Sequence, residues 1–212
     1  MYLKNKLPII FFLMFLSSCN EFQRVLKSED IKLKYEVAEK YYEDQEFRRA
    51  SRLFEQIQSQ YRGKPQAERV TFFYANSLLN TRKYIDAGYQ FESFIKAYPL
   101  SQKVDEAAYL GAYSYYKTSP VFSLDQKETL TAIDKLQEFI NSYPNSEKMS
   151  DANDLVQELR IKLEYKAFEI AKQKKCEVTG ISLSKNQIEY CRRKAKELNL
   201  DNQVKFELID YR

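Results

Sequence analysis

One helix-like segment occurs three times in the chain and limits the folds open to it more than any other feature. The clearest copy is AGYQFESFIKAYP, residues 87–99; it returns at residues 132–144 and, in weaker form, at residues 50–62. In each copy a small residue is followed at intervals of four, three and four by apolar residues, the last a tyrosine. This spacing is typical of one face of an α-helix. A helix that recurs behind another helix predicts a stacked helical-repeat protein.

Whole helix pairs also recur with a fixed period. Three pairs of identical residues in the first two repeats are each 37 positions apart: Ala38 and Ala75, Ala50 and Ala87, and Phe54 and Phe91. The order of small and aromatic residues resembles the tetratricopeptide repeat (TPR). We therefore predict an all-α TPR helical-repeat solenoid over residues 31–173, with about three and a half repeats. In the third repeat the corresponding interval is longer by eight residues, which predicts an inserted loop at residues 117–124.

The first residues have the pattern of an export signal. Lys4 and Lys6 precede a short apolar run, residues 7–16, which is too short to span a bilayer. The run ends in Leu-Ser-Ser-Cys, which resembles the bacterial lipobox, in which the cysteine is lipidated and becomes the first residue of the mature protein. We predict a lipoprotein signal peptide at residues 1–18, lipid attachment at Cys19 and a polar tether at residues 19–30. An ordinary signal peptide that happens to contain a cysteine is the alternative.

The composition argues against catalysis and against nucleic-acid binding. The chain has no histidine, which excludes histidine-based triads and histidine metal sites, and only four glycines, too few for a phosphate-binding loop. The formal charge of +4 is too small to indicate a nucleic-acid partner. We expect no catalytic residue, no metal and no cofactor, and therefore no enzyme.

The first helix of each repeat carries an aromatic stripe. Relative to the equivalent alanines Ala38, Ala75 and Ala112, positions three before, one after and four after should face a groove. An aromatic groove of this kind suits an extended peptide that contains aromatic residues. Half-buried packing is the alternative for any single tyrosine. The predicted groove residues are Tyr35, Glu39, Tyr42, Phe72, Asn76, Leu79, Tyr109, Tyr113 and Tyr116.

Residues 1–173 resemble the BamD (YfiO) family of outer-membrane assembly lipoproteins. The likeness rests on the LSSC motif, the early repeats, the insert SPVFSLDQKET and the segment DANDLVQELRIKLEYKAFEIAKQ. Asn20, rather than Asp, follows the cysteine, so nothing resembles the inner-membrane retention signal of some bacteria, and we expect a lipid-anchored protein on the periplasmic face of the outer membrane, with surface display as the alternative. The implied partners are BamA, the other subunits of the β-barrel assembly machine and unfolded outer-membrane protein precursors. The family has five repeats, the first three for precursors and the last two for BamA, whereas the array here stops midway through the fourth.

The last residues have a different character. Residues 177–181 and 204–208 have strand patterns on either side of a helix pattern, which predicts a βαβ-like appendage at residues 174–212. The segment GISLSKNQIEYCRRKAKELNLDNQVKFELIDYR resembles part of the cyclopropane-fatty-acyl-phospholipid synthases, which are S-adenosylmethionine-dependent methyltransferases. That resemblance implies vestigial cofactor contacts at Ser182, Leu183 and Gln187. The upstream glycine-rich strand and the catalytic residues are missing, so we predict a chimeric join without methyltransferase activity.

Three functions remain open from the sequence. The first is a lipid-anchored periplasmic scaffold that binds unfolded outer-membrane protein precursors. The second is a methyltransferase fragment fused to another periplasmic TPR lipoprotein. The third is a different periplasmic repeat lipoprotein, for example in envelope or division processes. Capture of BamA and binding of S-adenosylmethionine distinguish these possibilities.

Overall fold

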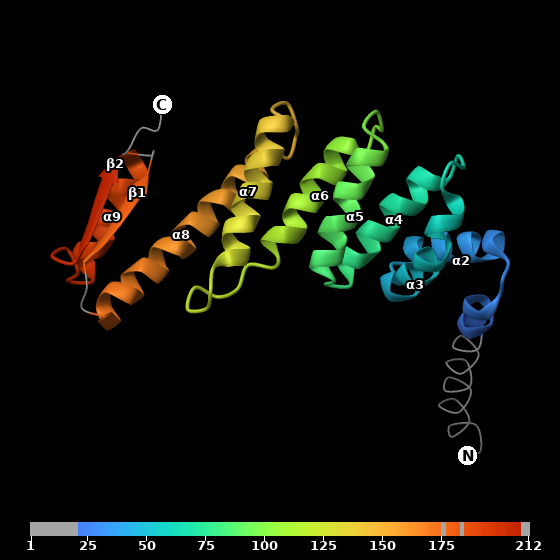
Figure 1. Ribbon diagram of the computed structural model, residues 1–212, viewed down its shortest axis with the longest axis horizontal. Helices are drawn as coiled ribbons and strands as arrows, with labels where there is room; N and C mark the ends of the chain where they lie inside the picture. The colour runs from blue at the N-terminus through green and yellow to red at the C-terminus, as the bar shows by residue number, and fades with distance from the viewer. Residues whose placement is uncertain (1–20, 175–176, 183–184, 209–212) are drawn as a thin grey trace, which may run out of the picture. The chain divides into compact units, whose positions relative to one another are not determined.

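The computed structural model describes residues 21–174, 177–182 and 185–208 (Figure 1). The chain divides into two compact units, residues 1–114 and 115–212. None of the described helices is both long enough and apolar enough to cross a membrane. The predicted helical-repeat fold with a short strand-containing appendage is confirmed.

The first unit contains two complete helix pairs and most of a fifth helix. The first pair is α2 (Ile31–Glu43) and α3 (Phe47–Ile57), followed by the short 3-10 helix η1 (Gln58–Tyr61). The second pair is α4 (Ala67–Asn80) and α5 (Tyr84–Ala97), and α6 (Val104–Tyr116) opens the third repeat. Asp30 caps α2 by accepting hydrogen bonds from the backbone of Lys32 at 2.9 Å and Leu33 at 3.0 Å.

The repeating small and aromatic positions form the core of this unit. The alanines at positions 38, 50, 75 and 87 are completely buried, as are Phe54, Phe91 and Phe94. Alanine allows the two helices of a pair to approach closely, and the phenylalanine rings fill the space between successive pairs. The backbones of α5 and α6 are also close, because a Cβ added at Gly111 would lie 3.1 Å from the Cβ of Phe91.

The turns between paired helices repeat down to single hydrogen bonds. In the first turn, the amides of Asp44, Gln45 and Glu46 donate to the carbonyls of residues 40, 42 and 41, at 2.9, 3.0 and 2.8 Å. The second turn contains the same three bonds 37 residues later, from residues 81, 82 and 83 to residues 77, 79 and 78, each at 3.0 Å. Gln45 and Arg82 both adopt left-handed φ angles, 59° and 64°. Each helix therefore ends in a Schellman-type turn.

Part of the expected tether is folded. Residues 21–27 are helical, and within this segment Phe22 and Val25 are buried against the first repeat. The ring of Phe22 packs edge-on against Tyr41, with 5.7 Å between ring centroids. This segment is mostly polar, but its few apolar residues recur at a spacing of three to four, so they share one helix face.

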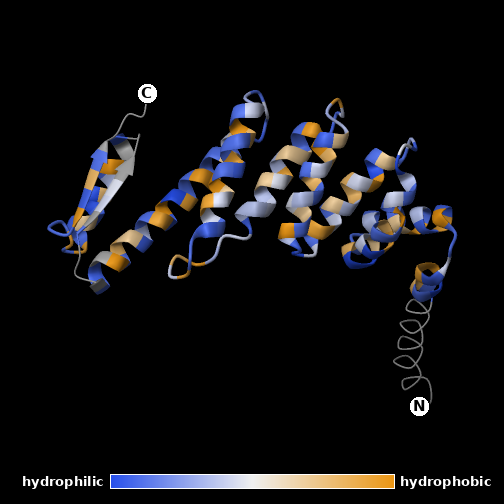
Figure 2. Cartoon of the chain, in the orientation of Figure 1, coloured by the Kyte–Doolittle hydropathy of each residue, from blue (hydrophilic) through white to orange (hydrophobic). Residues whose placement is uncertain are grey.

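The second unit begins with the inserted loop and the helices around it. After α6 ends at Tyr116, residues 117–126 form a loop before α7 (Lys127–Ser142), as predicted from the insertion. Figure 2 shows apolar residues in this loop, where Val121, Phe122 and Leu124 are exposed. The long helix α8 (Met149–Lys174) follows and packs against α7. It is the first helix of the predicted fourth repeat.

The appendage is a parallel crossover, as predicted. Strand β1 (Val178–Ser182) pairs in parallel with β2 (Val204–Leu208), and α9 (Lys185–Glu197) connects them. Ile188, Cys191 and Ala195 of α9 are buried with Phe206 of β2 and Phe168 of α8. Gly180 leaves room for the ring of Phe206, to which an added Cβ would come within 2.7 Å. Among the described residues the sheet has only these two strands.

Candidate peptide-binding surface

The first helices of the repeats carry most of the predicted groove residues at half-buried positions. In the first unit these are Tyr35, Glu39 and Tyr42 on α2, Asn76 and Leu79 on α4, and Tyr109 and Tyr113 on α6. We call these seven residues, together with Arg69 and Phe73 of α4, the first-helix surface. A half-buried ring is held in place by its inner edge and still offers an outer edge to a ligand.

Phe72 does not belong to this surface. Only 4% of the residue is exposed, and its ring packs against Phe91 at 5.9 Å and Phe94 at 5.5 Å between centroids. The prediction that Phe72 lines the groove is therefore wrong. Phe72 and Phe73 are adjacent, and the helix directs the first toward α5 and the second toward α2, where it stacks on Tyr42.

An ion-pair network that the sequence did not reveal joins α2 to α4. The guanidinium of Arg69 lies 2.8 Å from the Glu39 carboxylate and 4.0 Å from that of Glu43. The Tyr35 hydroxyl donates a hydrogen bond to Glu39. Burial and then this hydrogen bond raise the pKa of Tyr35 far above its ordinary value. Tyr35 therefore stays a neutral hydrogen-bond donor at any physiological pH.

Aromatic stacking extends the same surface. The rings of Tyr42 and Phe73 lie parallel, 4.0 Å apart with an interplanar angle of 10°. The guanidinium of Arg69 lies 5.0 Å from the centre of the Phe73 ring. Burial, and next the nearby carboxylate of Glu106 on α6, raise the pKa of Tyr42 to about 12. Glu106 belongs to the first turn of α6.

The tyrosines of α6 belong to two units. Tyr109 and Tyr113 stack on each other with 6.0 Å between centroids and 20° between planes. Tyr116 lies in the second unit, where its hydroxyl is 2.9 Å from both carboxylate oxygens of Glu158 on α8. In that position Tyr116 ties the end of α6 to α8.

Some predicted site residues lie outside the part of the chain that the structure describes. Cys19 and Leu183 are not among the described residues, nor are the side chains of Ser182 and Gln187. The backbones of the last two belong to β1 and α9. The lipid attachment and the vestigial cofactor contacts therefore stay predictions.

The chemistry of the first-helix surface is that of recognition. It combines flat apolar rings, neutral phenol donors and an ion pair held across two helices. Rings fixed by packing lose little conformational freedom when a ligand stacks on them.

Comparison with known proteins places the repeats in a family. Residues 28–177 match the YfiO family, which is described as an outer membrane lipoprotein. The outer membrane protein assembly factor BamD of Helicobacter pylori is 27% identical over 97 residues, which are 46% of this chain and 44% of that protein. The chain thus matches less than half the length of this relative. The family match covers more than half of the present chain, from just before α2 to just after α8, and the chain belongs to the YfiO family of outer-membrane lipoproteins.

Proposed function

We propose that this protein is a lipid-anchored scaffold of the outer-membrane β-barrel assembly machinery. Its lipid is attached at Cys19, and the protein lies on the periplasmic face of the outer membrane. The first-helix surface receives extended segments of unfolded outer-membrane protein precursors, and the protein works beside BamA and the other subunits. It is not an enzyme.

The observation that carries this proposal is a rigid aromatic surface on a protein of this family. Two rings stacked at 4.0 Å, an ion pair at 2.8 Å and a second tyrosine stack on α6 form a pre-organised face. The chain resembles a protein named as an outer membrane protein assembly factor, and outer-membrane β-barrel chains have strands that alternate apolar and polar residues and carry aromatic girdles. Stacking on tyrosine tolerates many sequences, which suits a protein that receives many precursors.

The inserted loop offers a second contact. Val121 and Leu124 are exposed by 63% and 57%, although the loop itself is held in one conformation by buried polar side chains. A long ordered loop with exposed apolar residues is typical of an interaction site. We propose that it contacts another subunit of the assembly machinery.

The test of the main proposal is peptide binding. A peptide with the sequence of a β-barrel C-terminal strand, which ends in an aromatic residue, is titrated into the purified protein and followed by fluorescence anisotropy. We expect Tyr113→Ala to weaken binding by about tenfold, because it removes half of a tyrosine stack. The matched control is Tyr89→Ala on α5, a tyrosine that is 63% exposed and lies outside the first-helix surface.

The outcomes separate the surface from the rest of the proposal. Equal affinity of Tyr113→Ala and Tyr89→Ala would show that the peptide does not use the first-helix surface. Capture of BamA from a membrane extract tests the assembly role independently. Without capture, the third possibility, a periplasmic repeat lipoprotein of another process, would be favoured.

We propose further that residues 174–212 form a separate appendage joined to the repeats. The family match ends at residue 177, immediately before β1. The appendage packs around a small core to which α8 contributes Phe168, and its parallel crossover is foreign to a helical solenoid. This pattern supports a chimeric join between a lipoprotein and a methyltransferase-like fragment.

A further inference from the structure

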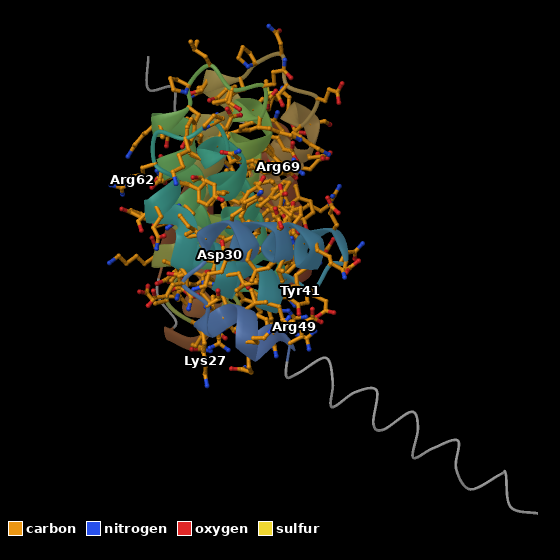
Figure 3. The ribbon with its side chains drawn as sticks, turned by 90° about the vertical axis from the view of Figure 1, so that its right-hand side faces the viewer. Lys27, Asp30, Tyr41, Arg49, Arg62 and Arg69 are labelled. Atoms are coloured by element: carbon orange, nitrogen blue, oxygen red, sulfur yellow. The ribbon has the colours of Figure 1, made fainter. Side chains whose placement is uncertain are left out.

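The folded segment at residues 21–27 fixes where the chain enters the first repeat. Phe22 contacts Tyr41, two residues before the end of α2, and Arg49, in the first turn of α3. The Arg49 guanidinium lies 5.7 Å from the Phe22 ring and 5.3 Å from the Tyr41 ring. Both Tyr41 and Arg49 lie at the turn between α2 and α3, and Figure 3 shows them close together. The chain therefore enters at the turn end of the repeat.

This entry point limits the reach of a lipid at Cys19. Phe22 is three positions after Cys19, and a fully extended chain of that length spans at most about 11 Å. The inference rests on the proposed lipid attachment at Cys19. A lipid in the membrane would then keep the α2–α3 turn near the headgroups.

A basic pocket lies at this same end. Its volume is about 450 Å³, and it is lined by residues 45–49 of the first turn and 80–82 of the second. Four lining side chains are charged: Glu46, Arg48, Arg49 and Arg82. Glu46 pairs with Arg49 at 2.7 Å. Arg48 and Arg82 are exposed, and no carboxylate in the described part of the chain pairs with either. Two guanidiniums are therefore available to an anion in the pocket.

An exposed apolar residue follows one of the lining arginines in the chain. Ile85, three residues after Arg82 and in the first turn of α5, is 68% exposed. Basic residues beside an exposed apolar side chain are typical of surfaces that lie in the headgroup region of a membrane. Arginine binds phosphate oxygens in a bidentate manner, which makes a phospholipid headgroup a good match for two guanidiniums.

We propose that this pocket, which we call the turn pocket, binds the phosphate headgroup of an anionic phospholipid. The turn end of the first two repeats then lies against the membrane that holds the Cys19 lipid. The lipid supplies the attachment, and the turn pocket supplies the orientation. The lipid and the basic pocket are two separate contacts with the membrane, and a second contact strengthens membrane association.

The test measures protection of the two turns at a membrane. The full chain is produced in a bacterial host that processes lipoproteins and is placed in nanodiscs of phosphatidylcholine, with or without phosphatidylglycerol. Hydrogen exchange is followed at residues 44–49 and 80–85. We expect slower exchange at both turns in the phosphatidylglycerol discs only. Each arginine near an anionic surface favours contact by roughly fivefold, so the Arg48→Gln/Arg82→Asn variant should lose about twenty-five-fold in protection.

The matched control removes the same charge from the other end of the helices. Arg62 follows η1, and Lys96 lies in the last turn of α5; both are exposed. Figure 3 shows Arg62 on the side opposite Arg49. Arg62→Gln/Lys96→Gln should retain the protection of the parent. Equal loss in both variants would mean general electrostatic attraction and would overturn the turn pocket. Asparagine at position 82 suits the left-handed φ, and circular dichroism confirms that each variant is folded.

Two further arms separate the possible explanations. In the first, the unacylated Cys19→Ser chain is mixed with phosphatidylglycerol vesicles; protection of the two turns there supports the headgroup site even if Cys19 carries no lipid. In the second, inorganic phosphate replaces the vesicles. Saturation by phosphate without protection by vesicles would overturn a membrane source and indicate a soluble anion. Peptide binding at the first-helix surface is measured separately, so its failure leaves these results unchanged.

Discussion

Tyr42 shows how a single residue couples the first-helix surface to pH. Its ring stacks on Phe73, and its hydroxyl lies in a half-buried site near Glu106. A phenol of ordinary environment has a pKa of about 10. Burial disfavours the phenolate, and the neighbouring carboxylate disfavours it further, so the pKa of Tyr42 in the folded state rises to about 12.

The raised pKa has a definite consequence for stability. The folded state holds the Tyr42 proton more tightly than the unfolded state, so the stabilisation is complete below about pH 10 and is lost as the pH rises through about 12. We expect Tyr42→Phe to remove this dependence, because phenylalanine keeps the stack and has no proton to lose. Between about pH 9 and about pH 12 the variant should lose about 1 kcal/mol less unfolding free energy than the parent.

Urea denaturation at a series of pH values measures this difference. Ultraviolet titration of the folded protein should also show one late-titrating tyrosine fewer in the variant. An unfolding free energy that falls equally in both proteins would contradict the assignment of the shift to Tyr42.

At the residue scale, the sequence predicted where a surface lies better than which atoms form it. Spacing from Ala38 and Ala112 correctly located half-buried tyrosines on α2 and α6. The same spacing chose Phe72 on α4, which is buried, although the half-buried ring at the surface is that of its neighbour Phe73. Period alone does not distinguish two adjacent aromatic residues, because each lies about 100° from the other around the helix and either can face the boundary of the core. The Glu39–Arg69 pair joins residues far apart in the chain, so no local pattern signals it.

Among the elements, the inserted loop is the clearest case of polar side chains holding irregular backbone. Gln126 is 5% exposed, and its amide donates to the carbonyls of Val121 and Leu124, both at 2.9 Å. Its oxygen accepts from the buried Thr129 hydroxyl at 2.8 Å. From α8, Lys162 donates to Ser119 at 2.9 Å. The loop therefore has an internal polar core in place of an apolar one.

Replacement of Gln126 tests this arrangement. We expect Gln126→Leu to destabilise the second unit by about 2–4 kcal/mol, because the carbonyls of Val121 and Leu124 lose their buried donor. Exchange of the loop amides should become faster, as measured by hydrogen exchange at residues 117–126. The control Glu128→Gln, at an exposed position of α7, should change stability by less than about 0.5 kcal/mol. A neutral result for Gln126→Leu would show that the loop is held by other contacts.

Elements in which apolar residues recur with a clear helix or strand period were predictable from the sequence, and elements with few apolar residues were not. The small-aromatic pattern of α3, α5 and α7 and the alternation in β2 located these elements closely. The helix at residues 21–27 was missed because its few apolar residues were too sparse to outweigh its polar ones. Its stability comes from docking Phe22 on Tyr41, which is a tertiary contact that local propensity does not include.

On the scale of the whole molecule, the chain combines two architectures with different requirements. The repeats bury their cores between successive helix pairs, whereas the appendage is a two-stranded parallel sheet with one crossover helix. Parallel sheets are normally covered on both faces. In the described residues the appendage buries Phe206 against Phe168 of α8, so it borrows part of its core from the repeat helix.

We expect the appendage to have no methyltransferase function. Isothermal titration of the full chain with S-adenosylmethionine should show no saturable heat, because one βαβ unit lacks the glycine-rich strand that would hold the cofactor. Titration of an intact methyltransferase of this fold provides the positive control. Micromolar binding by the present chain would contradict the expected absence of methyltransferase function and the scaffold as the whole function.

The recurring turn also has an evolutionary consequence. The same three backbone hydrogen bonds close the turns after α2 and α4, 37 residues apart. If a stretch of 37 residues is duplicated, each new helix therefore meets the next one at the same position of the repeat. An array of this kind can lengthen by unequal recombination, one helix pair at a time. Insertions of other lengths are tolerated only in loops, where they do not interrupt a helix. The eight extra residues lie in the loop between α6 and α7.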